Sequence, residues 1–483
     1  MGSRTNVFTT LVILCVIASF SAESSTVDVT RSDFPADFVF GVTTDAPQRG
    51  FRTTPICIAT DSYRRYKEDV VAMKNLGVDA NRFSIAWTRI LPNGSLNGGI
   101  NQEGLDHYNN VIDKLLKNGI QPFVTLLHFD PPQALTDKYG GVLSRSFVAD
   151  FKDYCELCFK TYGDRVKNWI TINEPLIMAK LGYDLGVGPP ARCSVPVKEH
   201  APACTGGNSG TEPYTVSHNL LLAHATVVNL YRDKFLGDQG GQIGLSLVGQ
   251  YDEPFSNSVE DKAAAKRLMD FEIGWYMEPL VYGDYPKIMR LLAKRRIPTF
   301  TVEEKKLMKG SFDFIGVNYC TARFGRYLPK KPGAPIAYSS DTFARAVTEN
   351  KDRVLIGPKA QGIDFIYSYP QGLQKLLEFM NQNYQCPTVY ITENGITEAK
   401  LDKSLKDPHR IQYILEHLYR IKMAMKNGVN VKGYFHWSLL DNFEFRQGFV
   451  PKFGLYYVDR NNNLTRIPKE SAKWLPKFLN DNA

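Results

Sequence analysis

Trp169-Ile170-Thr171-Ile172-Asn173-Glu174-Pro175 is the segment most informative about the fold, and Thr388-Val389-Tyr390-Ile391-Thr392-Glu393-Asn394-Gly395 has the same pattern. Each begins with a β-branched, apolar run that is typical of a buried strand. Each then places one glutamate directly after that run. Active sites of α/β barrels are built at the C-terminal ends of the parallel strands. We therefore expect Glu174 and Glu393 to face one pocket.

Each motif has an ordinary interpretation when it is taken alone. Asn-Glu-Pro is typical of a loop carboxylate or a charge at a helix N-terminus, and Thr-Glu-Asn-Gly is typical of a turn. Local structure does not explain their joint occurrence, because both follow buried strands and they lie far apart in the chain. Glycoside hydrolysis requires at least one pair of carboxyl groups, and here the two come from different strands. Glu174 and Glu393 are therefore the first candidate catalytic pair.

Strand-like and helical patterns alternate along the whole chain. The expected strands are 38–43, 78–85, 121–127, 169–172, 242–248, 312–319, 388–391 and 431–437. The expected helices include 61–75, 104–116, 147–162, 214–235, 261–277, 371–382 and 407–426. Eight alternations predict an α/β fold, a single (β/α)8 TIM barrel with the active site at its C-terminal face. No linker or repeat divides residues 25–483, so we expect one domain there.

Polar residues also recur at the predicted strand ends. One such residue means little, and His128 alone is more typical of a satisfied core histidine. Together with the two glutamates, however, they form a constellation on one rim: Gln48, Arg82, His128, Asn173, Asn318, Trp437 and Glu444.

Composition and charge narrow the possible partners. The chain has 483 residues, of which 43% are hydrophobic and 22% charged, which is ordinary for a globular protein. The net charge of +8 is spread over many helices, and the short basic clusters lack interleaved aromatics. Solvated helix faces explain this pattern, so we expect no nucleic-acid partner. No metal-ligand cluster stands out and no cofactor is expected. No feature specifies an oligomeric state.

The N-terminus and the cysteines indicate the secretory pathway. Residues 1–24 resemble a signal peptide that is removed, and no other run is long enough to span a membrane. An extracellular or vacuolar location is expected, with glycosylation at the sequons of Asn93 and Asn463. We expect Cys193 and Cys204, which flank a Pro- and Gly-rich loop, to form a disulfide. Cys155 and Cys158 lie within a helical pattern and are interpreted as core or partner-face cysteines.

The two glutamate motifs resemble the acid/base and nucleophile signatures of glycoside hydrolase family 1, the β-glucosidases. Arg82-Phe83-Ser84-Ile85-Ala86-Trp87 and Trp437-Ser438-Leu439-Leu440-Asp441-Asn442-Phe443-Glu444 extend the resemblance, which covers nearly all of the chain from Phe34 onward. It implies that Glu174 is the acid/base, Glu393 the nucleophile and a small β-glucoside the substrate. Residues implied in sugar binding are Gln48, His128, Asn173, Trp437, Glu444 and Phe445. Arg82, beside Glu393, would hold it ionised, and Asn318 and Cys320 would support the site.

Within that family the chain is most similar to the plant thioglucosidases called myrosinases, through residues 206–216 and the pair Glu444-Phe445. Myrosinases carry glutamine where this chain has Glu174. A thiolate leaves without a proton, whereas an alkoxide needs one, so the acid predicts O-glucosides as substrates. Gln250 also replaces the arginine that binds the substrate sulfate in that branch.

Two departures from the family pattern bear on activity. Only residues 49–60 follow Gln48, so the first β-α loop, part of the pocket wall, is about thirty residues shorter than the resemblance implies. Cys320 stands where the family has a tyrosine that hydrogen-bonds the nucleophile. Three functions remain open: a β-glucosidase that is weakened by its short loop, a thioglucosidase, and an inactive member of the family. For the first we expect carboxyl oxygens about 5–5.5 Å apart.

Overall fold

The computed structural model describes residues 27–44, 59–194, 204, 206–330, 332–333, 335–399, 405–444 and 447–480. The expected signal segment, Gln48 with most of the short first loop, and Phe445 lie outside the described residues.

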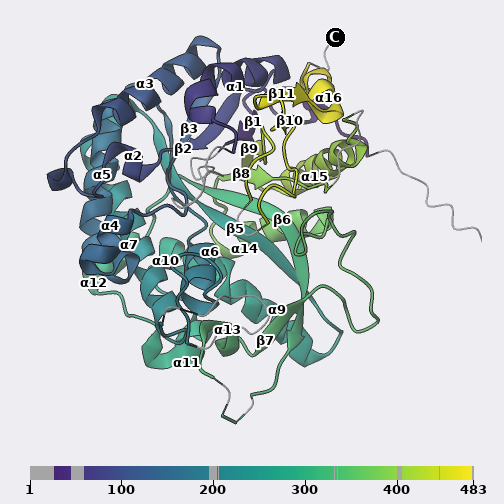
Figure 1. Cartoon of the computed structure of the whole chain (residues 1–483). Coiled ribbons are helices and arrows are strands. Elements are labelled where there is room, and N and C mark those ends of the chain that lie inside the picture. Colours follow the sequence, from purple (N-terminus) through teal and green to yellow (C-terminus); the bar gives the residue numbers. More distant parts are fainter. Residues whose placement is uncertain are drawn as a thin grey trace, which may run out of the picture.

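Eight parallel strands form a closed barrel (Figure 1). They are β1 (Val39–Thr43), β2 (Ala80–Ser84), β3 (Gln121–Leu127), β4 (Asn168–Asn173), β5 (Gln242–Pro254), β6 (Phe314–Tyr327), β8 (Val389–Asn394) and β9 (Val431–His436). Neighbours in sequence pair all around the sheet, β9 pairs with β1, and β5 pairs with β6 in the same parallel sense. The predicted (β/α)8 fold is confirmed.

Helices between the strands cover the outside of the barrel (Figure 1). The main ones are α1 (Ser62–Leu76), α3 (Gln102–Lys117), α5 (Ser146–Tyr162), α7 (Glu212–Lys234), α9 (Val259–Phe271), α10 (Ile273–Tyr282), α14 (Pro370–Asn383), α15 (Pro408–Lys426) and α16 (Glu470–Leu479). The single helix expected over 261–277 is wrong. Glu272 leaves the helical region (φ −102, ψ −85), and its carboxylate pairs with Lys180 Nζ at 3.1 Å.

Two strands continue well beyond their expected ends. We expected them to stop at residues 248 and 319, but β5 and β6 stay paired as far as Pro254 and Gly325. The short strand β7 (Ala344–Val347) then adds antiparallel to β6. A separate hairpin, β10 (Tyr456–Asp459) with β11 (Thr465–Pro468), follows the last barrel strand. These additions extend the C-terminal side of the barrel, where the candidate site lies.

An aromatic layer fills the lower interior of the barrel. Its members are Ala80, Phe123, Ile170, Phe314, Tyr390 and Phe435. The rings of Phe123 and Phe435 meet edge to face at 4.8 Å. Gly41 on β1 makes room for them, because a Cβ there would lie 2.3 Å from the Phe435 ring. Since strand side chains alternate, inward positions nearer the C-terminal ends of the strands carry polar residues such as Arg82 and Asn318.

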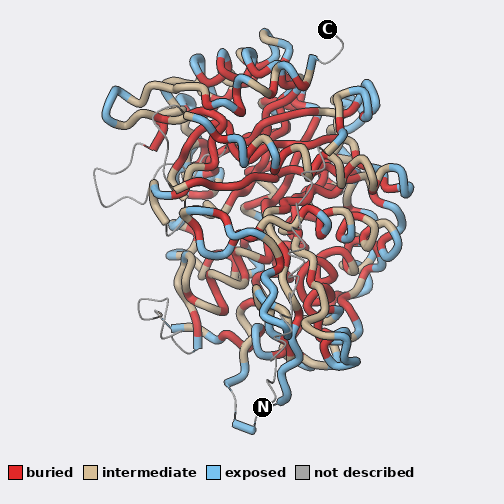
Figure 2. The backbone as a smooth tube through the Cα atoms, turned by 90° about the vertical axis from the view of Figure 1, so that its right-hand side faces the viewer, coloured by how far each residue is buried: buried red, intermediate tan, exposed pale blue. Residues whose placement is uncertain are grey.

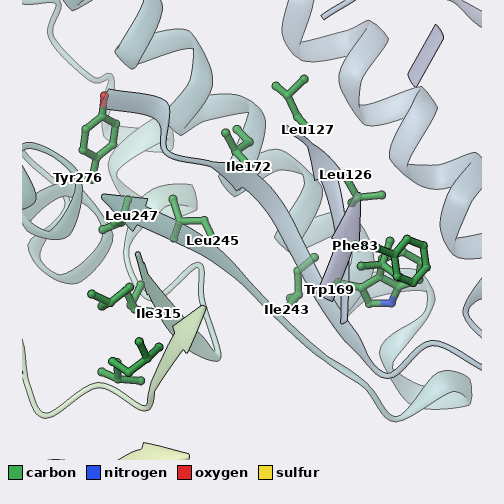
Figure 3. Packing of buried hydrophobic residues seen from close by; sticks show 14 of the residues in the cluster. Phe83, Leu126, Leu127, Trp169, Ile172, Ile243, Leu245, Leu247, Tyr276 and Ile315 are labelled. Carbon is green, nitrogen blue, oxygen red and sulfur yellow. The ribbon is translucent and has the colours of Figure 1, made fainter. Parts of the chain in front are cut away.

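The larger apolar layer lies between the strands and the surrounding helices. Figure 2 shows buried backbone concentrated inside the molecule and exposed backbone at its edge. In Figure 3, Trp169, Phe83, Leu126 and Ile243 point to this layer from neighbouring strands. The Trp169 ring contacts Phe159 of α5 edge to face at 5.0 Å. This packing fixes the strands whose ends carry the polar rim.

Phe435→Ala tests the aromatic layer. Phe435 is fully buried, so truncation loses transfer energy and leaves a cavity. We expect the free energy of unfolding, measured by denaturant titration, to fall by about 3–5 kcal/mol. The control Phe365→Ala, at a half-exposed position, should change it by less than about 1 kcal/mol. Equal losses for the two variants would contradict the interior packing described here.

Candidate active site

Glu174 lies at the point where β4 ends and α6 (Pro175–Ala179) begins. Its backbone is left-handed (φ 43, ψ 61), and Pro175 occupies the first turn of the helix. The Glu174 amide donates to the Ser246 carbonyl of β5 at 2.8 Å. An unusual backbone held by neighbouring strands is common at functional sites. It turns the carboxyl group toward Asn318, whose Nδ2 donates to Glu174 Oε1 at 2.9 Å.

Glu393 lies within β8 and is 9% exposed. Its carboxylate accepts a hydrogen bond and ion pair from Arg82 Nη1 on β2. Arg82 is itself buried and uses Nη2 to donate to Asn173 Oδ1 at 2.6 Å. The expected pairing of Arg82 with Glu393 is confirmed. Asn173 is connected to the two glutamates through its neighbours, since its side chain contacts Arg82, Asn318 and His128.

Asn318 connects the two glutamate motifs. Its Nδ2 donates both to Glu174 Oε1 and to Asn173 Oδ1, at 2.9 and 3.0 Å. Its Oδ1 accepts from Thr392 Oγ1 at 2.7 Å. Thr392 therefore fixes which end of the amide faces Glu174. The sequence reasoning missed this role of Thr392, although its place in the motif, one residue before Glu393, was a usable signal.

Asn394, on the other side of Glu393, was also missed. It is fully buried, and its Nδ2 donates to the Tyr319 carbonyl of β6 at 2.6 Å. Its Oδ1 accepts from Tyr434 of β9 at 2.9 Å. The residues on both sides of Glu393 are thus tied to neighbouring strands. This limits the movement of the carboxylate between them.

Burial raises the pKa of both glutamates. For Glu174, burial together with the nearby charge of Glu393 raises the pKa to about 8, against smaller opposing effects of Asn318 and Arg82. For Glu393, burial also raises the pKa, and the charge and hydrogen bond of Arg82 oppose the rise. Arg82 thus lowers the pKa of Glu393, as expected from the sequence, but burial has the larger effect. Arg82 still makes Glu393 the partner that is easier to ionise.

His128, at the end of β3, lies near Trp437. Their rings are stacked with centroids 6.4 Å apart. Asn173 Oδ1 already accepts from Arg82 and Asn318, so Asn173 Nδ2 donates to His128 Nε2 at 3.2 Å. Burial and the Arg82 charge hold the pKa of His128 well below its usual range. His128 is therefore a neutral ring in this rim, with its proton on Nδ1.

Glu444 adds a third carboxyl group. Its backbone bridges to Gly448 through hydrogen bonds of 2.8 and 2.9 Å. Burial, with a contribution from the charge of Glu393, raises its pKa to about 7, although a hydrogen bond from Trp437 opposes the rise. Oε1 of Glu444 is buried without a hydrogen-bond partner among the described residues. That free acceptor is a position at which a ligand hydroxyl could donate.

The remaining residues that the sequence predicted at the site are Gln48, Phe445 and Cys320. Gln48 and Phe445 lie outside the described residues. Cys320 is partly exposed and packs beside Trp437 and Tyr413. Burial and the charges of Glu393, Glu174 and Glu444 raise the pKa of its thiol, so it is a neutral group near three carboxyls.

The other cysteines agree with the sequence interpretation. Cys193 and Cys204 are joined by a disulfide, which confirms that prediction. Cys155 and Cys158 are free and fully buried in α5, as core residues. Asn93 and Asn463 are both exposed, so the two sequons are accessible. Across the described ranges, there is no group of three or more metal-ligating side chains. Likewise, no helix among those residues is both long and apolar enough to cross a membrane.

Comparisons with known proteins agree with this site. A model of glycosyl hydrolase family 1 matches residues 44–483. β-Glucosidase 12 of rice (Oryza sativa subsp. indica) is 47% identical over 500 residues, covering 97% of each protein. The solved structure of a mutant rice β-glucosidase, in a covalent complex with glucose, has a TM-score of 0.89 at 41% identity and covers 94% of this chain and 100% of that one. An aphid myrosinase has a TM-score of 0.80 at 32% identity, covering 92% and 99%.

A family match over most of the chain, and a relative of such high identity along nearly its full length, show that this protein is a glycosidase belonging to glycosyl hydrolase family 1.

Proposed function

We propose that the protein is a retaining β-glucosidase that hydrolyses O-β-D-glucosides. The observation that carries the proposal is the pair of carboxyls in unequal surroundings, with Glu393 beside the Arg82 guanidinium and Glu174 beside the neutral Asn318 amide. Glu393, beside Arg82, is the nucleophile and attacks the anomeric carbon. Glu174, with its pKa of about 8, protonates the glycosidic oxygen as that bond breaks. It then takes a proton from the water that releases glucose from Glu393.

The rest of the rim supplies the sugar subsite. In this proposal Trp437 stacks on the apolar face of the pyranose, and His128, Asn173 and Glu444 hydrogen-bond its hydroxyls. Gln48 and Phe445 complete the set by resemblance to the family. The rice neighbour with covalently bound glucose supports a glycosyl-enzyme in this fold. We also propose that residues 25–483 form one domain, which is glycosylated at Asn93 and Asn463 and lies in the vacuole or outside the cell.

A short first loop weakens this activity. The alignment with the rice relative extends over 500 residues, more than the 483 of this chain, so the relative has stretches without a counterpart here. A missing wall beside Gln48 admits water, and fixed charges act less strongly on the reacting atoms in water than in a closed site. Cys320 further deprives Glu393 of the tyrosine hydroxyl that the family places there.

A thioglucosidase is the second candidate, supported by the likeness to the aphid myrosinase. The environment of Gln250 argues against it. Its Nε2 donates to Asp252 and to Glu272, both at 3.3 Å. An uncharged amide between two carboxylates offers no positive charge for a sulfate. The carboxyl of Glu174 also favours leaving groups that need a proton.

Turnover by the purified protein tests the assignment. We expect hydrolysis of 4-nitrophenyl β-glucoside and a larger defect on an alkyl β-glucoside, because the poorer leaving group demands more of Glu174. Glu393→Gln should lower kcat by at least about a thousandfold. Faster release of aglycone from a glucosinolate than from the aryl glucoside would favour the thioglucosidase. A folded protein inert on both substrates would support the inactive alternative.

The pH dependence of kcat/KM tests the roles of the two glutamates. Activity needs Glu174 protonated and Glu393 ionised. We expect kcat/KM to fall about tenfold per pH unit above about pH 8, as Glu174 loses its proton. Glu174→Gln has no proton to lose, so its residual activity on an activated aryl glucoside should show no fall in this range. A basic limb that is unchanged in this variant would sink the assignment.

Restoring the two features that differ from the family, the first loop and the residue at position 320, tests the cause of weak activity. Restoring a first loop of family length together with Cys320→Tyr should raise kcat/KM by at least about tenfold, since it returns both the wall and a donor to Glu393. Cys320→Phe with the same loop is the matched control, because it adds the ring without the hydroxyl. If the unrepaired protein already matches ordinary members of the family, this account of the loop is wrong.

A further inference from the structure

A network of buried charges lies behind the rim on the side of β8 and β9. Its members are Glu398, Asp407, Arg410, Asp441 and Lys469, and none of them is more than 4% exposed. They come from four places in the chain: the loop after β8, the start of α15, the loop after β9, and the residue that precedes α16. Charges are rarely buried unless they are paired, and a buried ion pair is weak evidence for stability. The network therefore calls for another explanation.

Lys469 is one of several links between the two rim loops, which are also joined by a backbone bridge between Glu398 and Lys452. Its Nζ donates to Glu398 Oε1 at 2.8 Å and to Asp441 Oδ1 at 3.0 Å. Glu398 lies five residues after Glu393, on the loop that leaves β8. Asp441 lies between Trp437 and Glu444, on the loop that leaves β9. One fully buried ammonium thus holds the loop behind the nucleophile against the loop that carries the sugar-binding candidates.

Arg410 contacts both of these loops. Its Nη2 contacts Glu398 at 3.1 Å and the Lys452 carbonyl at 3.0 Å, and its Nη1 donates to the carbonyls of Ile396 and Phe453. Its Nε donates to Asp407 at 2.8 Å. Each nitrogen of the Arg410 guanidinium therefore has at least one acceptor. Among the described residues, it is Lys469 that forms an ion pair with Asp441.

Regular secondary structure does little to hold the loop after β9. Its pairing consists of isolated bridges: Leu440 with Tyr456, Glu444 with Gly448, and Lys452 with Glu398 of the loop after β8. Asp441 supplies further order, because its Oδ1 also accepts from the Gly454 amide at 2.9 Å. A Cβ at Gly454 would lie 2.2 Å from the Asp441 nitrogen, so the two backbones pack directly together. The Asp441 carboxylate and its cation thus fix the loop three residues before Glu444.

We propose that Lys469 is a positioning residue for the sugar subsite, acting through Asp441 to place Trp437 and Glu444 relative to Glu393. The proposal rests on the proposed function, because those residues bind the sugar only in a β-glucosidase. Lys469 touches no substrate. Its effect is on selectivity for the sugar, since a displaced Glu444 loses its contact with one particular hydroxyl while the nucleophile and acid/base stay in place.

Lys469→Met tests the proposal in a form that does not need turnover. Calorimetry would measure the affinity for an aryl β-C-glucoside and for the matching C-galactoside, which differ at one hydroxyl and cannot be hydrolysed. We expect the preference for the glucoside to fall at least about tenfold in the variant, with weaker glucoside binding as the cause. In turnover of aryl β-glucosides the same variant should raise KM more than it lowers kcat.

Lys422→Met is the matched control. Lys422 is partly buried and, like Lys469, paired with a carboxylate, Asp33 at 2.8 Å, but it lies on α15 near the N-terminal end of the barrel. It should lose some stability and keep its selectivity. If both variants lose Tm and neither changes the preference, Lys469 is merely structural and the proposal is wrong. Wild type that binds the glucoside selectively but does not hydrolyse it would refute the proposed function alone, and failure to bind either sugar would overturn both.

Two milder changes test the proposal if Lys469→Met does not fold. In the double variant Lys469→Met with Asp441→Asn, a neutral amide replaces the carboxylate that would otherwise lose its cation. This removes the main destabilising effect of the single variant. Asp441→Asn alone keeps an oxygen that accepts from the Gly454 amide and weakens only the link to Lys469. Both should shift the sugar preference in the same direction as Lys469→Met. A folded double variant with wild-type preference would overturn the proposal.

Discussion

The guanidinium of Arg82 is the constraint on which the site depends. One nitrogen binds the Glu393 carboxylate and another binds Asn173 Oδ1, the neighbour of Glu174. Strands β2, β4 and β8 are not all adjacent in the barrel, so this side chain connects them across the interior. Asn318 closes the connection by donating to Asn173 and Glu174. Without the cation, two carboxyls buried this deeply would share protons with no fixed assignment between them.

Unequal surroundings give the two glutamates different tasks. Both are penalised by burial, but Glu393 has the cation and Glu174 has a neutral amide. The charge that Arg82 stabilises on Glu393 then raises the pKa of Glu174 further. Two chemically identical side chains can therefore act as nucleophile (Glu393) and acid (Glu174). The barrel contributes by fixing these distances, since each group stands at the end of a strand held by an apolar layer on both sides.

Much of this was visible in the sequence, because strands and motifs are local. All eight barrel strands and both glutamates followed from apolar runs and the residue after each. Contacts between distant segments were not visible. Lys469 looked like one of many solvated lysines, yet it is fully buried between Glu398 and Asp441. The continuation of β5 and β6 depends on their pairing with each other, and the break at Glu272 accompanies an ion pair with Lys180. Neither feature produces a periodic hydrophobic pattern in the sequence.

The covalent intermediate on Glu393 is the most direct test of the account. An activated aryl 2-deoxy-2-fluoro-β-glucoside forms the glycosyl-enzyme faster than water can release it, so the adduct accumulates on a retaining enzyme. Intact mass spectrometry should show one added fluoroglucosyl group, and peptide mapping should place it on Glu393. An adduct on another residue would contradict the assignment of the nucleophile. Steady hydrolysis of the parent glucoside with inversion of configuration, and no adduct, would contradict the retaining mechanism itself.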